Sequence, residues 1–142
     1  LKNKVGVAIG SESYASYRSM LASERFARLA ADGAQPQRLL FASTGVKDPS
    51  VPDTFYVESL AAADTINTMP DATLKAFADH GSVNAVLPAD GGDAVNDLAA
   101  IAAAGIDLEA LATRLQEDGK DAFVASWNDL LGSIRTKAGR DA

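Results

Sequence analysis

The chain has 142 residues, of which 47% are apolar, and its formal net charge is −6. This length and apolar content are enough for one globular domain with a core, and no apolar run approaches the ~20 residues that a membrane-spanning helix needs. Because the sequence has no cysteine and one histidine, it excludes disulfides, thiolate nucleophiles and metal sites built from cysteines or from several histidines.

The charge pattern disfavours nucleic acid as a partner, because acidic residues are scattered and no stripe of Lys and Arg is present. It still admits a small phosphorylated substrate, which needs only one or two local cations. We expect a cytoplasmic protein, because no secretory signal pattern is seen at the start. The first residue is Leu1 rather than methionine, as expected of a chain that was processed, cut or cloned out of a longer protein.

The first part of the chain is predicted to be helical, apart from one ambiguous segment. Residues 4–10 favour a strand by local propensity. Tyr14 and Tyr17 fit a helix that follows. Ser23 is a suitable cap for a second helix, which Gly33 closes.

A continuous apolar run from Leu39 to Ala42 predicts a strand that is buried on both faces. Ser43, Thr44, Gly45 and Lys47 follow it and offer two hydroxyls, a flexible backbone and a positive charge. Parallel α/β proteins bind ligands at this end of the sheet, and barrels often seat phosphate in the loops of their last two strands. The turn is therefore a candidate phosphate site.

Each residue of this turn has a simpler alternative. Ser43 and Thr44 can serve only to end the strand. Lys47 can be a Schiff-base nucleophile, a phosphate clamp or a solvated loop lysine. The nucleophile is the weakest of the three, because no second cation lies nearby in the sequence to activate the amine.

The middle of the chain contains a second short strand. Residues 53–60 are β-prone, although Asp53 is also a good cap for a short helix. Residues 64–68 predict a strand that leads into a helix from Pro70 to Gly81. His80, in the last turn of that helix, is expected to be structural, because a cation is favoured there and no acid or nucleophile is placed to work with it.

The remainder is predicted to be a helical tail over about residues 93–137, after a loop around Pro88. Asp107 caps a helix that Gly119 is expected to end. A last amphipathic helix follows, in which Phe123 and Trp127 are expected to be core residues.

Two short strands therefore precede an all-helical tail. A two-stranded sheet leaves both edges and much apolar surface uncovered, so it does not make a stable α/β domain. The sequence indicates one end of a larger α/β fold.

Several motifs in a fixed order give this chain a specific resemblance. They are ASTGVKDP at 42–49, PDTFYV at 52–57, NTMPDATL at 67–74, DHG at 79–81, AGID at 104–107 and LQEDG at 115–119. Together, from about Lys4 to Leu131, they resemble the carboxyl-terminal part of transaldolase. The nearest branch is the bacterial one that includes transaldolase/glucose-6-phosphate isomerase fusions.

The resemblance implies an α/β fold, the C-terminal part of a (β/α)8 TIM barrel with a helical C-terminal tail. Leu39–Ser43 is then strand seven and Thr65–Thr68 strand eight. Residues 4–20 and 53–60 become helices, against their local β propensity. Because such a barrel takes about 250 residues, residues 1–142 are expected to form a single partial domain.

The family transfers a dihydroxyacetone unit between sugar phosphates in the pentose phosphate pathway, through a lysine Schiff base and without a metal or other cofactor. The resemblance places that lysine on the fourth strand and the acid/base carboxylates on earlier strands. No catalytic residue is therefore expected in this chain, which alone is expected to be inactive.

Substrate contact is expected only at the turn after strand seven. Ser43 matches a phosphate-binding serine of the family, whereas Thr44 and Lys47 are assigned from the chemistry of the turn. The expected partners are sugar phosphates and the remainder of the barrel. The alternative is a non-catalytic α/β-helical module that retains a barrel-end sequence.

Overall fold

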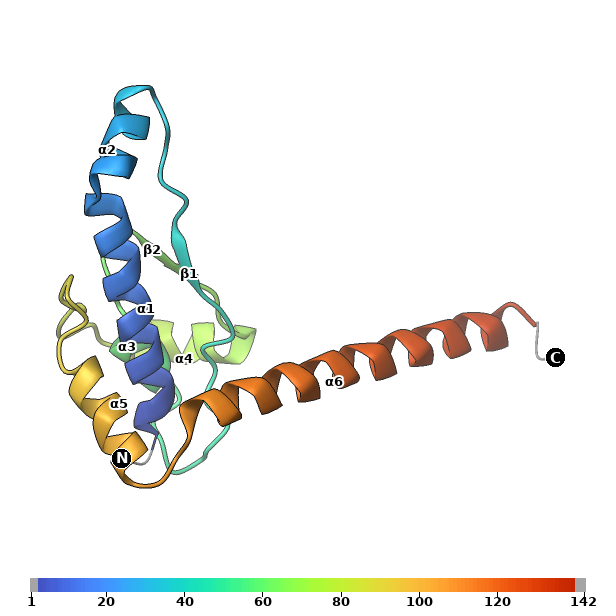
Figure 1. The fold of residues 1–142 in the computed structure, drawn as a ribbon. Coiled ribbons are helices and arrows are strands. Elements are labelled where there is room, and N and C mark those ends of the chain that lie inside the picture. Colours follow the sequence, from blue (N-terminus) through green and yellow to red (C-terminus); the bar gives the residue numbers. More distant parts are fainter. Residues whose placement is uncertain (1–2, 140–142) are drawn as a thin grey trace. The chain divides into compact units, whose positions relative to one another are not determined.

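A computed structural model describes residues 3–139 of the chain (Figure 1). Its elements are α1 (Lys4–Ala22), α2 (Glu24–Ala31), β1 (Leu39–Phe41), α3 (Phe55–Ser59), β2 (Thr65–Asn67), α4 (Asp71–His80), α5 (Ala94–Ala103) and α6 (Leu108–Lys137). The chain divides into two compact units, Leu1–Ile101 and Ala102–Ala142, which are described separately below.

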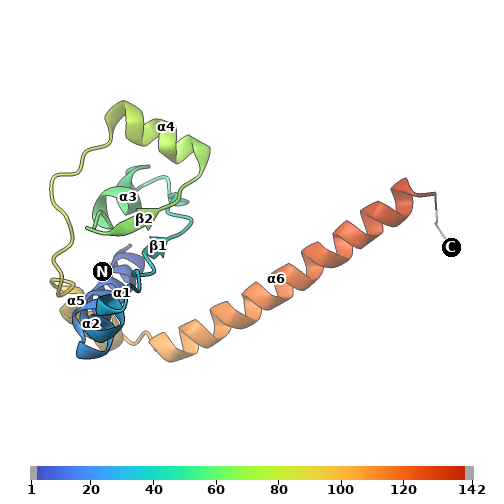
Figure 2. The same cartoon turned by 90° about the horizontal axis from the view of Figure 1, so that it is seen from above.

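The sheet of the first unit consists of β1 and β2, which pair in parallel with Leu39 opposite Thr65 and Phe41 opposite Asn67. Parallel strands need a crossover, and α3 lies within it. Both strands lie where the sequence predicted them, although β1 ends before Ser43. Figure 2 shows α4 on the far side of the strand pair from α1.

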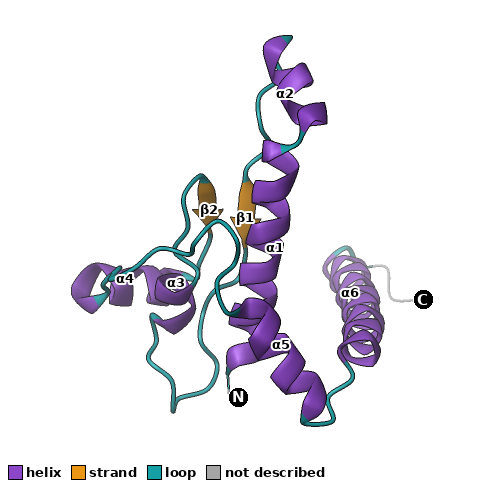
Figure 3. Ribbon diagram, turned by 60° about the vertical axis from the view of Figure 1, so that its left-hand side comes forward, coloured by secondary structure: helices purple, strands orange, loops and turns teal. Residues whose placement is uncertain are grey.

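One face of the strand pair packs on α1 and the opposite face is open. Figure 3 shows α1 alongside β1, and Phe41 is buried in the core with Tyr14, Tyr17 and Leu60. On the other face, Leu40 is 47% exposed and Ile66 is 41% exposed. The prediction of a strand buried on both faces is therefore wrong for the described residues, because α1 covers only one face.

Residues 4–10 belong to helix α1, so the strand predicted from local propensity is wrong and the helix implied by the resemblance is confirmed. The reason lies in the burial pattern. Ala8, Ser11, Tyr14 and Tyr17 are the buried residues of α1; each lies three residues from the next, so they form a continuous buried stripe that winds along the helix. Packing of this stripe outweighs the β propensity of the first turns.

Local capping chemistry is confirmed at two helix starts. The Ser23 side chain accepts a hydrogen bond from the Phe26 N–H at 3.2 Å, and Asp107 accepts one from the Ala110 N–H at 3.0 Å. Residues 53–60 contain α3, so the helical alternative holds there. No helix in the described part of the chain is long and apolar enough to cross a membrane.

The second unit contains α6, a continuous helix of 30 residues. The prediction that Gly119 ends a helix is wrong. A single glycine inside a helix costs only about 1 kcal/mol relative to alanine, which strong helix formers on either side offset. The expectation that Phe123 and Trp127 are core residues is also wrong within the described part of this unit, because they are 81% and 60% exposed.

We predict that the isolated chain folds with low cooperativity. Its open strand face and the apolar side chains of α6 leave surface that neither unit covers within itself, and such surface favours association. Thermal unfolding followed by circular dichroism should be broad, and sedimentation should show self-association. Replacing Phe123 and Trp127 with serine should reduce the association without loss of helix. A monomeric wild-type chain with one sharp transition would contradict the prediction.

Candidate functional site

The turn predicted to bind phosphate begins directly after β1. Ser43 is exposed and has a φ of 57°, in the left-handed region that a non-glycine residue adopts only at a cost. Thr44, in contrast, is buried, and its Oγ1 lies 2.6 Å from Oδ1 of Asn67 and 3.2 Å from the carbonyl oxygen of Thr68. The turn is thus held to the end of β2.

Gly45 brings the turn against the start of α4. A Cβ at this position would lie 2.9 Å from Cγ of Pro70 and 3.4 Å from Oγ1 of Thr73, which is closer than a rigid proline ring readily allows. The ends of β1 and β2 and the amino end of α4 therefore meet at one place. Loops of neighbouring parallel strands beside a short helix are a common phosphate site in barrels.

Lys47 lies farther along the turn and is exposed. It lines a pocket of about 210 Å³, together with Asn3, Gly45, Val46, Asp48, Val51 and Tyr56. Asn3 is the residue that precedes α1, so this pocket lies at the amino end of that helix, where partial positive charge favours an anion. Ser43 and Thr44 are not among the residues that line it.

The structure thus brings the three predicted residues into one turn but gives them different surroundings. Ser43 is exposed at the strand end, Thr44 is buried, and Lys47 lines the pocket beside α1. An exposed lysine lacks the desolvated surroundings that activate a Schiff-base nucleophile, so the turn is better suited to binding than to covalent chemistry.

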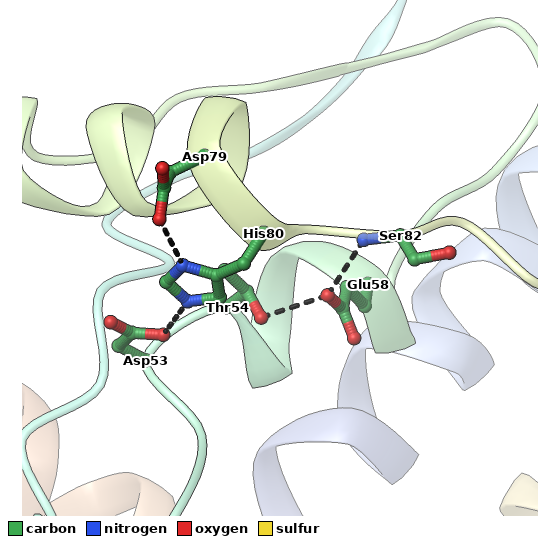
Figure 4. Close-up of polar contacts among 6 residues, drawn as sticks. All are labelled: Asp53, Thr54, Glu58, Asp79, His80 and Ser82. Carbon is green, nitrogen blue, oxygen red and sulfur yellow. Dashed lines mark hydrogen bonds and ion pairs between the residues drawn. The ribbon is translucent and has the colours of Figure 1, made fainter.

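A second polar cluster surrounds the single histidine (Figure 4). Nε2 of His80 lies 2.9 Å from Oδ1 of Asp53, and Nδ1 lies 3.2 Å from Oδ2 of Asp79. Oε1 of Glu58 accepts hydrogen bonds from the Thr54 hydroxyl and from the Ser82 N–H, at 2.8 and 3.0 Å. The cluster therefore ties the start of α3 to the end of α4.

The protonation of this cluster follows from its hydrogen bonds. The pKa of His80 is raised, first by the hydrogen bond with Asp53 and then by the one with Asp79. The pKa of Glu58 is lowered, first by the Ser82 N–H and then by the Thr54 hydroxyl. The expectation from the sequence that no acid is placed to work with His80 is therefore wrong: the adjacent Asp79 contacts the ring, and the fold brings Asp53 to it from 27 positions away.

Histidine and carboxylates are also metal ligands, but within residues 3–139 no group of three or more such side chains is arranged to hold an ion. The contacts of His80 described above are with two carboxylates, both on exposed residues. Such an arrangement can link two helices through charge. It contains no nucleophile for the histidine to activate.

The parallel strands, joined through a helix and packed against α1, define an α/β protein. The family model described as Transaldolase/Fructose-6-phosphate aldolase matches residues 1–134. The chain is 48% identical over 134 residues to a transaldolase of Neisseria meningitidis serogroup A, and 46% identical over 141 residues to a transaldolase of Frankia alni. These matches cover 94% and 99% of this chain, and 38% of each relative.

The chain therefore belongs to the transaldolase/fructose-6-phosphate aldolase family. The resemblance seen in the sequence motifs is confirmed. The chain spans less than two-fifths of the length of these relatives.

We predict that Asp53 is the main cause of the raised pKa of His80. Asp53→Asn should lower this pKa toward the ordinary value of 6.5, and by more than Asp79→Asn does. Because the folded-state pKa is raised, the stabilisation is fully present below pH 6.5 and is lost as the pH rises through the raised pKa. The chain has one histidine, so a single Cε1–H resonance reports the titration by NMR.

Glu24→Gln is the matched control, since it removes the same charge from α2, where Glu24 pairs with Arg28. If the Asp53→Asn and Glu24→Gln variants shift the His80 pKa equally, the hydrogen bond with Asp53 is not its cause.

Proposed function

We propose that residues 1–142 are the C-terminal part of a cytoplasmic transaldolase. In this proposal β1 and β2 are strands seven and eight of a TIM barrel, and residues from about 93 to 137 are its helical tail. The main support is 48% identity over 134 residues to a protein named transaldolase, of which the match covers 38%. The parallel pairing of β1 and β2 and their open face agree with two strands taken from a larger barrel.

The completed barrel transfers a dihydroxyacetone unit between sugar phosphates of the pentose phosphate pathway. Here "completed barrel" means residues 1–142 joined to the remaining part of the barrel, either in a full-length gene product or in a fusion to the unmatched segment of the Neisseria relative. A lysine on an upstream strand forms the Schiff base with the ketose carbonyl. Lys47 of this chain is exposed and does not suit that role, which agrees with a Schiff-base lysine outside residues 1–142.

The contribution of this chain to the site is recognition of the substrate phosphate. Ser43 presents its side chain at the end of β1, and Lys47 supplies a cation beside the amino end of α1. The first turn of α4 adds backbone N–H groups next to Gly45. Asp71 in that turn opposes an anion, although its charge is paired with Lys75 at 2.7 Å.

The second candidate is a non-catalytic module that retains the barrel-end sequence and works through its helices. The exposed apolar side chains of α6 favour it, because such a face suits contact with another protein. Covalent trapping of the substrate distinguishes this module from the transaldolase.

We predict that the isolated chain does not turn over fructose 6-phosphate with erythrose 4-phosphate. In the completed barrel, borohydride reduction in the presence of dihydroxyacetone should trap an adduct, which mass spectrometry should locate on a lysine outside residues 1–142. Activity of the isolated chain, or an adduct on Lys47, would overturn this assignment. A completed barrel without any adduct would favour the module.

We also predict that Ser43→Ala raises the KM of the completed barrel for phosphorylated donors. A hydrogen bond to a charged group contributes about 1.5–3 kcal/mol, which corresponds to a rise of roughly ten- to a hundredfold. Lys47→Ala should act in the same direction. The measurement is kcat/KM with phosphorylated and unphosphorylated donors.

Two variants serve as matched controls. Ser13→Ala removes a hydroxyl that donates to the Ile9 carbonyl within α1, and Lys120→Ala removes a lysine of α6 that pairs with Asp121. Both should leave the preference between donors unchanged. An equal loss for both donors in Ser43→Ala would show that this serine supports the fold or the chemistry rather than the phosphate.

A further inference from the structure

The hydrogen bond between Thr44 and Asn67 links the phosphate turn to the end of β2. The two side-chain oxygens are 2.6 Å apart, and Thr44 is 5% exposed, so water does not compete for the bond. Backbone bonds reinforce the same link, since the Thr68 N–H donates to the Phe41 carbonyl at 2.8 Å. Thr44 is thus fixed by its side chain in the middle of the turn.

Asn67 is an unusual residue for its position. It is the last residue of β2, opposite Phe41 of the core, and its Nδ2 is buried without a hydrogen-bond partner among the described residues. Exchanging the amide oxygen and nitrogen keeps the link, because Nδ2 then donates to Thr44, whose hydroxyl donates to the Thr68 carbonyl. In either orientation one amide atom stays unpaired, which costs stability. The hydrogen bond between Asn67 and Thr44 offsets this cost.

The bond acts on the residues on either side of Thr44. Ser43 holds its left-handed φ of 57° only if its surroundings oppose relaxation, and an anchored Thr44 does so. On the other side, Gly45 lies against Pro70. Without the hydrogen bond between Thr44 and Asn67, the Ser43 side chain is free to turn away. Gly45 is then also held less closely against Pro70 at the start of α4.

We propose that Asn67 is a positioning residue that sets the phosphate-binding turn through the hydroxyl of Thr44. This inference rests on the proposed function and deepens it. Thr44 then acts through its neighbours, whereas Ser43 and Lys47 contact the phosphate. In this proposal the upstream strands bind the rest of the substrate. Turnover of an unphosphorylated donor therefore depends less on the hydrogen bond between Thr44 and Asn67.

The test uses the completed barrel and removes the bond from each end, with Asn67→Ala and Thr44→Val. Each variant should raise the KM for fructose 6-phosphate about five- to tenfold more than the KM for an unphosphorylated donor, and should weaken competitive inhibition by inorganic phosphate in parallel. The kcat values should change little. Thr44→Ser keeps the hydroxyl and should restore most of the affinity. The double variant should lose no more than Thr44→Val alone, because the bond between Thr44 and Asn67 is already absent in that variant.

Thr65→Val is the matched control. It removes a hydroxyl that donates to the Ala62 carbonyl at 2.8 Å, at the opposite end of β2. It should lower the melting temperature without changing the preference between donors. If Asn67→Ala does not fold, the comparison of Thr44→Ser with Thr44→Val tests the same bond.

Equal losses for both donors, or additive losses in the double variant, would overturn the role of Asn67 while leaving the proposed function standing. A wild-type completed barrel without a trapped adduct would instead remove the proposed function, and this inference with it.

Discussion

The parallel pairing of β1 with β2 is the constraint on which the rest of the first unit depends. Strands that run in the same direction end at the same edge, so the residues after β1 and the start of α4 must lie together there. The same pairing requires a crossover, and the helix within it delivers Leu60 to the core beside Tyr14 of α1. One backbone ladder thus positions both the core and the turn.

How well the sequence predicted each element depended on how far away the deciding interaction lay. The caps at Ser23 and Asp107 are hydrogen bonds that span three residues, so they could be read from the sequence directly. Residues 4–10 were ambiguous because distant packing decides their structure: Gly6 lies against Tyr56 and Gly10 against Leu60, in each case 50 positions away. The family resemblance implied the correct helix for these residues, whereas local propensity favoured a strand.

The sequence indicated which residues make up the candidate anion turn, but not how the surroundings of each residue differ. A run of hydroxyls, glycine and lysine after a strand indicated an anion site, and Ser43 and Lys47 have surroundings that suit one. Nothing in the local pattern separates Thr44 from Ser43, since both are small and hydroxylated. Their difference arises from the register of the strands, which places Asn67 beside Thr44 alone. The Asp53–His80 contact was missed for the same reason.

The backbone conformation of Ser43 restricts which amino acids can occupy this position. Its left-handed φ of 57° is adopted most readily by glycine, then by asparagine and aspartate. Glycine would relieve the backbone but supply no polar group, and aspartate would place a negative charge where an anion is expected. Threonine would keep a hydroxyl but is β-branched, and bulky branched residues are the least tolerant of this conformation. Few amino acids therefore satisfy the conformation and the chemistry together: serine does so at a backbone cost, and asparagine is the main alternative, because it tolerates the left-handed region and carries an uncharged polar group.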